Sequence, residues 1–394
     1  MAVQKVATQV IEDAAVTDAK LNTTGTMPAW NGSALTNLPE SGDKRNFIID
    51  GDFTQWPTGT SFTITDLVYH CALWENRKIG FTSLAATVSQ ETSVLPSSSN
   101  SNHSSVYSLK TLINTAEAAA SGDFLSHRYW ITGHDFARLR YDSANGAVFA
   151  FWARCSVAGT YSICLTLGSD TYSKSFVISS GDTWELIQIA LPDMSAKAPV
   201  HDMHTGGGII IDLVLAASGS RAQTDNTWSG SGTCYGVTGQ TNLSDTLNAT
   251  FYLSQVSLTL GSTAPTFSSP PVATVRDQVK YYVEELNPDS VDYYRFGTGS
   301  ARSGTSLSCF MNYYPKRIDN PTKTLGSSTA GHYGWMNHAD LNITGSALPT
   351  FGAAGGKVGM QTVNQTINSG ANAGDSGSFR AFHATAKILI DARH

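Results

Sequence analysis

Short apolar runs, most of them alternating with polar residues, recur through the middle of the chain. The runs are Val148–Trp152, Tyr161–Leu167, Tyr172–Ile178, Trp184–Leu191, Ile209–Leu215 and Phe251–Leu260. Each has the length of a β-strand, and turns rich in Gly, Ser and Asn separate them, which is typical of a β-sandwich. No repeat of roughly 20–50 residues is visible, which argues against a β-helix or a propeller.

Two tryptophans and three aliphatic residues in these runs are candidates for the core. Trp152 ends the first run, and Trp184, Leu186, Ile187 and Ile189 occur in the fourth. Alternate residues of a strand face opposite sides of its sheet, so a buried face collects apolar side chains. We therefore expect these residues to pack between two sheets.

The segment Val272–Leu286 breaks the strand pattern. Its apolar residues recur three or four positions apart, at Val272, Val275, Val279, Tyr282 and Leu286. Prolines lie just before and just after the segment, as expected at the ends of a helix. The spacing predicts an amphipathic helix between two β domains, whose apolar stripe packs within its own chain or against copies of itself.

The first 45 residues form a region of a different character. Val6, Val10, Ile11 and Val16 give a weak apolar stripe, and turn-forming residues surround Trp30. The region is too short and too polar to make its own core. We expect it to be ordered only against partner chains; a flexible terminus is the alternative interpretation.

The patterns together predict a mostly β protein with several parts. A chain of 394 residues corresponds to two or three domains. The expected parts are an extended N-terminal segment (1–45), a jelly-roll-like β-sandwich (46–268), a linking helix (269–289) and a small C-terminal β domain (290–394).

The composition restricts the partners of the protein. Only 14% of the residues are charged, and the net charge is −6, which argues against nucleic-acid binding through a basic face. No apolar stretch reaches the roughly 18 residues of a spanning helix, so no membrane insertion is expected. The polar surface must come from Ser, Thr, Asn and Gly, which suits neutral polar ligands such as sugars.

The cysteines and histidines predict no metal site and no cofactor. The five cysteines include no C-x-x-C spacing, so zinc and iron–sulfur sites are unsupported. We expect free, buried thiols, although Cys155 and Cys164 could also face each other across a hairpin. The run His201–His204 holds two histidines and an aspartate, but it adjoins a Gly-rich stretch in which ligand geometry would be loose.

Paired carboxylates are the main signal for an enzyme. Polysaccharide cleavage needs two carboxyl groups on either side of the scissile bond. Asp50 and Asp52 are two residues apart and would share one face of a strand. Turn hydrogen bonding or a structural cation is the favoured interpretation of this pair. Glu284 and Glu285 are interpreted as solvated helix residues.

Two groups of aromatic and histidine residues are candidates for sugar binding. Trp228 lies in a polar loop, and His332, Tyr333, Trp335 and His338 cluster in a Gly-rich stretch near the end of the chain. Aromatic rings with a polar edge give both apolar area and hydrogen bonds to a sugar. A packed turn is the alternative for the second group.

Several segments carry a resemblance to bacteriophage tail-fibre proteins. IEDAAVTDAKLNTTGTMPAWNGSALTNLP (Ile11–Pro39) resembles their N-terminal segments, and NFIIDGDFTQWPTGTSFT (Asn46–Thr63) resembles the opening strand of their β-sandwich module. Later pieces of that module follow in order at Arg128–Gly133, Phe151–Arg154, Gly159–Ser162, Gly181–Glu185 and Ala264–Phe267. The elements Val279–Tyr282, Asn320–Thr322 and Ile388–Ala392 resemble the end of these proteins, although Val279 and Lys280 replace a usual Gln–Arg pair.

The resemblance implies a virion protein that is assembled in the host cytoplasm. It implies a homotrimer whose residues 1–45 attach to other tail or capsid proteins, so Val6, Val10, Ile11, Val16 and Trp30 are the candidate anchoring residues. It also implies a tail fibre that binds a host surface polysaccharide and mediates attachment. It assigns no catalytic residue, so no enzymatic activity is expected.

Two other functions remain as alternatives. A structural virion component, such as a head fibre or a tail adaptor, would bind no receptor. A polysaccharide depolymerase would release reducing sugar ends, and it would depend on an acidic pair such as Asp50 and Asp52.

Overall fold

The computed structural model describes residues 45–197, 207–233, 235–337, 341–352, 355 and 357–393. The candidate anchoring residues Val6, Val10, Ile11, Val16 and Trp30 lie outside this part of the chain. Within it, strands dominate, which confirms the expected mostly β fold. The division of the chain at residues 45, 268 and 289 stays a prediction.

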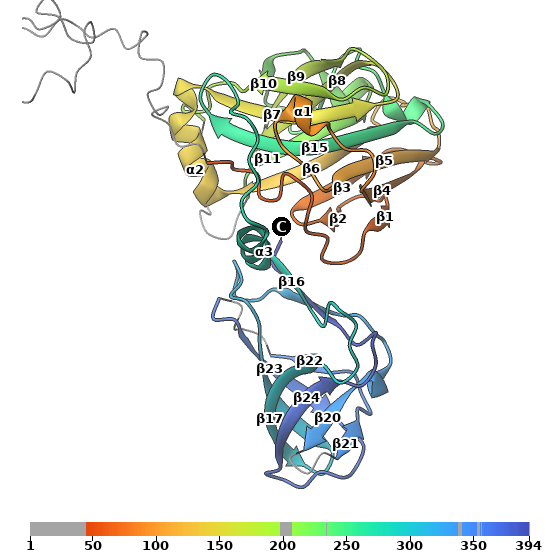
Figure 1. Cartoon of the computed structure of the whole chain (residues 1–394), viewed down its shortest axis with the longest axis vertical. Coiled ribbons are helices and arrows are strands. Elements are labelled where there is room, and N and C mark those ends of the chain that lie inside the picture. Colours follow the sequence, from red (N-terminus) through yellow and green to blue (C-terminus); the bar gives the residue numbers. More distant parts are fainter. Residues whose placement is uncertain are drawn as a thin grey trace, which may run out of the picture. The chain divides into compact units, whose positions relative to one another are not determined.

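The first half of the described chain is a sandwich of two antiparallel sheets (Figure 1). The first sheet consists, in spatial order, of β1 (Ser61–Thr63), β4 (Ala85–Glu91), β5 (Ser108–Thr115), β15 (Thr250–Leu260), β7 (Ala147–Cys155) and β10 (Glu185–Ala190). The second consists of β13 (Thr227–Ser229), β9 (Asp170–Ile178), β8 (Gly159–Leu167), β11 (Gly207–Ala217), β6 (Phe124–Thr132), β3 (Trp74–Ile79) and β2 (Val68–Cys71).

The core of the sandwich lies between these two sheets. Phe149 and Phe151 point inward from β7, and Tyr161 and Ile211 meet them from the second sheet. Their burial removes aromatic and aliphatic surface from water and supplies the main stabilisation of the domain. The inward residues alternate with outward ones, as the sequence pattern predicts.

The segment that resembles an opening strand is mostly a series of turns. Asn46–Phe53 runs beside β15, where Phe47 N–H donates to Leu258 O and Val256 N–H donates to Gly51 O. Asp50 and Phe53 have positive φ values of 57° and 54°, so the chain turns rather than extends. The expectation that Asp50 and Asp52 share a strand face is therefore wrong.

Three α-helices and a small parallel pair complete the sandwich region. The elements are α1 (Ser98–Ser101), α2 (Gly133–Asp142), α3 (Val272–Lys280) and the pair β12 (Ala222–Gln223) with β14 (Gly236–Val237). Thr132 caps α2 by accepting a hydrogen bond from Asp135 N–H, which satisfies a backbone donor at the helix start. Among the described residues no helix has the length and apolar character needed to span a membrane.

The predicted amphipathic helix is shorter than expected. It ends at Lys280, and Val283–Leu286 forms strand β16 instead. β16 pairs with β25, placing Val283 opposite Asp391 and Leu286 opposite Ile388. Sheet pairing and burial of Val283 and Leu286 therefore override the helical spacing, as tertiary context commonly does.

The C-terminal region contains two further sheets (Figure 1). The smaller one is β16 (Val283–Leu286), β25 (Ile388–Asp391) and β19 (Thr322–Leu325). The larger one, called the C-terminal sheet below, is β21 (Asn342–Thr344), β20 (Tyr333–Asn337), β24 (Ser376–Ala381), β17 (Arg295–Ser303), β18 (Ser306–Asn312), β23 (Met360–Thr366) and β22 (Thr350–Phe351). Residues alternate strictly between buried and exposed along β23, so one face of this sheet packs on a core and the other meets solvent.

Candidate functional site

Strand β10 lies at the edge of the first sheet and has a hollow on each side. Among the described strands it pairs only with β7, which places Leu186 opposite Trp152 and Gln188 opposite Ala150. Ile187 and Ile189 are buried, whereas Leu186 and Gln188 are exposed. The alternation follows from the two-residue period of a strand, and it gives β10 one apolar side and one mixed side.

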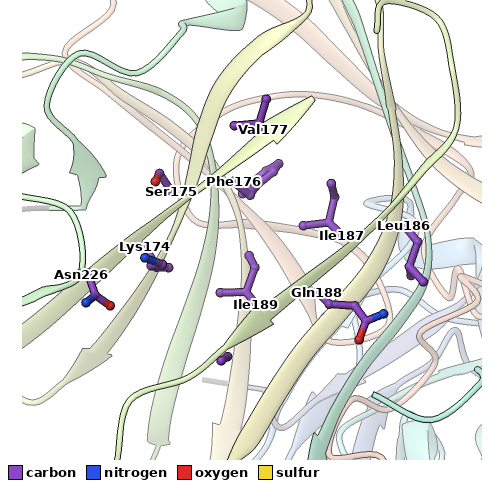
Figure 2. Close-up of a pocket in the computed structure, with 10 residues that line it drawn as sticks. Lys174, Ser175, Phe176, Val177, Leu186, Ile187, Gln188, Ile189 and Asn226 are labelled. Atoms are coloured by element: carbon purple, nitrogen blue, oxygen red, sulfur yellow. The ribbon is translucent and has the colours of Figure 1, made fainter. Parts of the chain in front are cut away.

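The first hollow lies between β9 and β10 and has a volume of about 500 Å³ (Figure 2). Its apolar lining includes Phe176, Ile187 and Ile189. Figure 2 shows Lys174 and Asn226 close together, on the opposite side from Leu186 and Gln188. A hollow of this size with an apolar lining and a few polar groups has the character of a small-molecule site.

Hydrogen bonds hold the polar end of this hollow in place. The carboxylate of Asp225 accepts hydrogen bonds from the backbone N–H and the hydroxyl of Ser175, both at 2.8 Å. Burial alone would raise the pKa of Asp225, but these bonds and the charge of Lys174 outweigh it and lower that pKa. Tyr172 Oη donates to Asn226 Oδ1 at 2.6 Å, so the Asn226 amide NH₂ group is the part left to meet a ligand.

The second hollow lies on the outer side of the first sheet and has a volume of about 240 Å³. Trp152 and Gln188 line it from β7 and β10, and the loop Ala264–Phe267 lines it from the other side. Ala264 N–H donates to Gln188 Oε1 at 3.3 Å. The hollow is smaller than the roughly 300–1,000 Å³ of drug-sized sites, so a single sugar ring is the scale of ligand that it suits.

Gln255 contributes a buried polar atom to this second hollow. It lies in β15 at a break in the register between Ser254 and Ser257, and its φ is 52°. Its Nε2 donates to the hydroxyls of Ser101 and Ser105, both at 3.0 Å, while its Oε1 has no partner among the described residues. An unpaired buried acceptor costs free energy, and a ligand hydroxyl could supply the missing donor.

The outer face of the first sheet continues with aromatic residues. Trp152 and Trp184 are half-buried rather than part of the core, and Leu186 is 47% exposed. Trp184 contacts Tyr252 at 6.3 Å between ring centroids, and Arg154 lies over the Tyr252 ring at 5.5 Å. Of the five predicted core residues, only Ile187 and Ile189 are fully buried, because the other three lie on the outer face of the sheet.

Trp228 lies near the first hollow and is half-buried. It packs on Tyr172 with ring centroids 5.3 Å apart, and Lys197 Nζ lies 4.0 Å from the centroid of its ring. A cation over an indole face is a stabilising contact. One face of the ring is therefore occupied by Lys197, and its role as a sugar contact stays a prediction.

The second predicted aromatic group is largely internal. Tyr333 and Trp335 are both 0% exposed and belong to the core beneath the C-terminal sheet. Tyr333 Oη donates to Lys387 O at 3.0 Å. The expectation that these two side chains contact a surface sugar is corrected by their burial, because alternation along β20 turns both rings inward.

Of the two histidines in that group, the structure describes only His332. His332 is half-buried and stacks on His383 with ring centroids 4.1 Å apart. Its Nδ1 contacts the hydroxyls of Ser327 at 2.8 Å and Thr385 at 3.0 Å. His338 lies outside the described residues. The role of His332 as a sugar contact stays a prediction.

The acidic pairs have structural partners. Asp50 accepts hydrogen bonds of 2.7 Å from Thr54 N–H, Thr54 Oγ1 and Gln55 N–H, and burial raises its pKa to about 6. Asp52 lies 3.0 Å from His103 Nε2. This arrangement is the turn hydrogen bonding that the sequence favoured for Asp50.

The glutamate pair also departs from its interpretation as solvated helix residues. Glu284 and Glu285 lie in strand β16, where Glu284 pairs with the buried Lys316 at 2.9 Å. Glu285 pairs with Lys387 at 2.8 Å. Both carboxylates are therefore engaged in ion pairs.

The thiols match the sequence prediction where the structure describes them. Cys71, Cys155 and Cys309 are free, these three and Cys164 are buried, and burial raises the pKa of each of the four thiols. Cys234 lies outside the described residues, as does the run His201–His204. No group of three metal-ligating side chains occurs within the described ranges.

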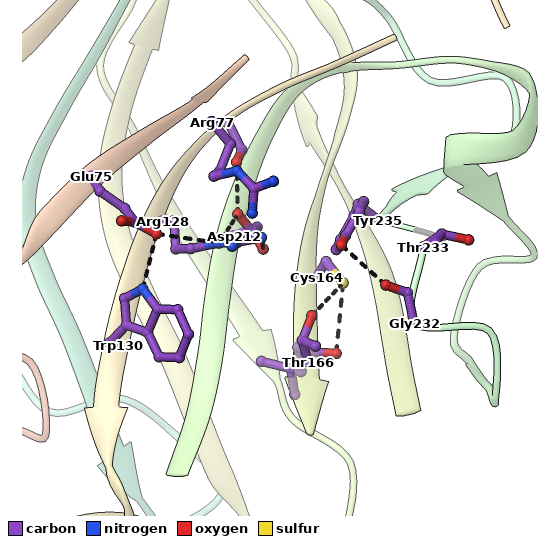
Figure 3. Close-up of polar contacts among 12 residues, drawn as sticks. Glu75, Arg77, Arg128, Trp130, Cys164, Thr166, Asp212, Gly232, Thr233 and Tyr235 are labelled. Atoms are coloured by element: carbon purple, nitrogen blue, oxygen red, sulfur yellow. Dashed lines mark hydrogen bonds and ion pairs between the residues drawn. The ribbon is translucent and has the colours of Figure 1, made fainter. Parts of the chain in front are cut away.

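The second sheet carries a buried ionic cluster that the sequence patterns do not predict (Figure 3). Arg128 donates to Asp212 through Nε and a terminal nitrogen, both at 2.9 Å. Glu75 lies 3.9 Å from Arg128 Nε and accepts a hydrogen bond from Trp130 Nε1 at 2.9 Å. Burial raises the pKa of Glu75, and the Trp130 bond and the Arg128 charge oppose that shift. The cluster is too deeply enclosed to meet a polymer, so it is a structural feature.

Comparison with known proteins gives structural likeness only. No protein family and no curated protein matches the sequence. TmCBM61 bound to β-1,4-galactotriose is similar at 9% identity over 54% of this chain and 97% of its own, with a TM-score of 0.27. A family 11 carbohydrate-binding module from Clostridium thermocellum bound to a mixed-linked tetrasaccharide is similar at 10% identity over 53% and 100%, with a TM-score of 0.26. A family 30 carbohydrate-binding module is similar at 9% identity over 56% of this chain and 98% of its own, with a TM-score of 0.26. Likenesses this weak assign no ligand to the chain.

Proposed function

We propose that this protein is a non-enzymatic bacteriophage tail fibre that binds a host cell-surface glycan through the two hollows beside β10. The observation that carries the proposal is the position of β10, whose two sides meet two separate hollows. Leu186 and Gln188 line both of them. One strand can therefore contact two adjacent units of a polysaccharide.

The chemistry of the hollows suits a neutral sugar. Trp152 offers an aromatic surface to the apolar face of a sugar ring. Gln188, Gln255 and Asn226 offer amide groups to its hydroxyls. Lys174 is the one charged residue among those that line the two hollows, and neutral amides cost less to desolvate than charged groups.

The virion role rests on the sequence resemblance. Ile11–Pro39 and the ordered motifs of the β-sandwich module support a tail fibre whose residues 1–45 attach to other virion proteins. A homotrimer would present three copies of the β10 hollows. Linked sites gain effective concentration without new contacts, so weak individual sites can give firm attachment.

Binding of the full-length protein to host cells and to their purified surface polysaccharide tests the proposal. Trp152→Ala and Gln188→Ala should each weaken binding about tenfold or more, since each removes a contact from a hollow. Tyr141→Ala is the matched control because Tyr141 is 78% exposed on α2 and lines neither hollow. Equal binding by all three variants would refute the assignment of the site.

Two further readouts separate the alternative functions. Release of reducing sugar ends during binding would indicate a depolymerase, and Asp50→Asn and Asp52→Asn would then be the variants to assay. Absence of cell binding, together with loss of virion incorporation after deletion of residues 1–40, would favour a structural virion component.

A further inference from the structure

The outer face of the C-terminal sheet carries a hollow of about 580 Å³. Strands β20, β24, β17 and β18 supply its lining, which includes Arg295, Arg380 and Phe310. The volume falls within the roughly 300–1,000 Å³ range of small-molecule sites. This hollow has no part in the function proposed above.

Two arginines lie directly opposite each other in this hollow. Arg295 in β17 is the register partner of Arg380 in β24, and both line the hollow. Like charges in such a pair destabilise a sheet. Within the described ranges neither arginine forms an ion pair with a carboxylate, so the protein itself does not offset the repulsion.

The arginines are held differently. Arg380 Nε donates to Ser378 Oγ at 2.7 Å, which fixes its guanidinium along the sheet. Arg295 is exposed, and its guanidinium makes no hydrogen bond with any residue that the structure describes, although its backbone pairs with β24. Arginine has five N–H donors in a planar fork that matches a carboxylate. The pair therefore has donors free for an anion.

The rest of the lining consists of hydroxyl groups and one exposed ring. Thr298, Ser376 and Ser378 line the hollow beside the arginines. Phe310, the cross-strand neighbour of Thr298, is 51% exposed on the same face. An exposed phenyl ring among hydroxyls suits the mixed apolar and polar surface of a sugar.

We propose that this hollow binds a carboxylated saccharide. Arg295 and Arg380 hold the carboxylate, Phe310 packs on the sugar ring, and the hydroxyls of Thr298 and Ser376 meet the sugar hydroxyls. A two-fold contact between two copies through this face would bring four arginines together, which opposes that occupant. The net charge of −6 opposes nucleic acid.

Titration calorimetry with the full-length protein tests this site. The probes are trigalacturonate and 3′-sialyllactose, with the methyl ester of the first and lactose as their neutral counterparts. The variants are Arg295→Gln, Arg380→Gln and Phe310→Ala. Arg276→Gln is the matched control, because it removes the same charge from an exposed position on α3.

The expected result is binding of at least one acidic probe, at least tenfold tighter than its neutral counterpart. Each of the three variants should weaken that binding tenfold or more, and the control should leave it unchanged. Failure of both acidic probes to bind, or equal weakening by Arg276→Gln, would overturn the proposal. So would a change in oligomer mass on Phe310→Ala, since it would show that a second copy covers the face. Trp152→Ala should leave this binding intact, which keeps the test separate from that of the β10 hollows.

Discussion

Arg128 and Asp212 face each other across β6 and β11 and make two parallel hydrogen bonds of 2.9 Å in the enclosed part of the sandwich. Ser126 donates a third hydrogen bond to the same carboxylate at 2.7 Å. Both charged side chains are almost fully buried, so each depends on the other for compensation of its charge.

Asp212→Ala should therefore destabilise the protein by about 3–5 kcal/mol, because it leaves the Arg128 charge buried and unpaired. Urea unfolding followed by circular dichroism would measure the change in the free energy of unfolding. Asp319→Ala is the control: it breaks the exposed pair with Lys357 and should cost less than about 1 kcal/mol. Similar losses of unfolding free energy in the two variants would show that burial does not make the Arg128–Asp212 pair more important for stability.

The buried histidines should make the fold sensitive to acid. Burial lowers the pKa of His127 from 6.5 to about 3, and it lowers that of His70 as well. Between about pH 6.5 and pH 3 the unfolded chain binds more protons than the folded chain. The free energy of unfolding should therefore fall with falling pH, by about 1.4 kcal/mol per pH unit for each histidine.

His127→Gln tests this pH dependence. Glutamine does not titrate and can keep a hydrogen bond to Thr111, which contacts His127 at 2.6 Å. Asp50 changes the free energy of unfolding in the opposite direction to the histidines, because its raised pKa favours the folded state as the pH falls below about 6. Asp50 is present in both the parent and His127→Gln, so comparing the two proteins at every pH removes its contribution. The slope should decrease in His127→Gln relative to the parent protein; equal slopes in the two proteins would count against the prediction.

Trp335 should matter for stability rather than for sugar binding. Its ring is fully buried and packs within the core beneath the C-terminal sheet, so Trp335→Ala should cost about 3–5 kcal/mol. Phe310→Ala on the exposed face of the same sheet should change the free energy of unfolding by less than about 0.5 kcal/mol. Denaturant unfolding would measure the two changes in the free energy of unfolding. A Trp335→Ala protein with unchanged stability and reduced cell binding would contradict this prediction and support Trp335 as a sugar contact.

Gly299 and Gly377 form a direct cross-strand pair in the C-terminal sheet. A Cβ on Gly299 would lie 2.1 Å from Ser308 O, and one on Gly377 would lie 2.6 Å from the Trp335 ring. Gly299→Ala should thus lower the thermal midpoint by several degrees, because the backbone must move to admit the methyl group. Gly230→Ala is the control, since nothing lies within 4 Å of its Cβ position; an equal midpoint in both variants would show that the sheet adapts without strain.

The positions of most of these strands could be predicted from the sequence. The run Tyr161–Leu167 lies within β8, and the runs Ile209–Leu215 and Phe251–Leu260 lie within β11 and β15. Strong alternation and Gly-rich turns make these signals local, so a single sequence carries them. The end of the helix before Val283 could not be predicted, because it depends on pairing with a strand more than 100 residues away in the sequence.

The residues of the candidate site were much harder to predict from the sequence. The sequence predicts Trp152 in the core because the nearby Phe149 and Phe151 are apolar, yet Trp152 faces the other side of the sheet. Periodicity gives the alternation but does not say which face is covered. Trp335 illustrates the converse: its Gly-rich sequence surroundings resemble a loop, whereas its ring is buried beneath the sheet next to Gly377 of a distant strand.

The edge position of β10 has a consequence for adaptation. The backbone groups along the free edge of an edge strand remain available for hydrogen bonds, and they are the same whatever residues the strand contains. Contacts that a receptor made with this edge would persist through substitution, while the side chains of Gln188 and Asn226 could vary. If these hollows bind a glycan as proposed, variants with altered glycan preference should therefore accumulate changes in the residues that line the hollows and leave the path of the strand unaltered.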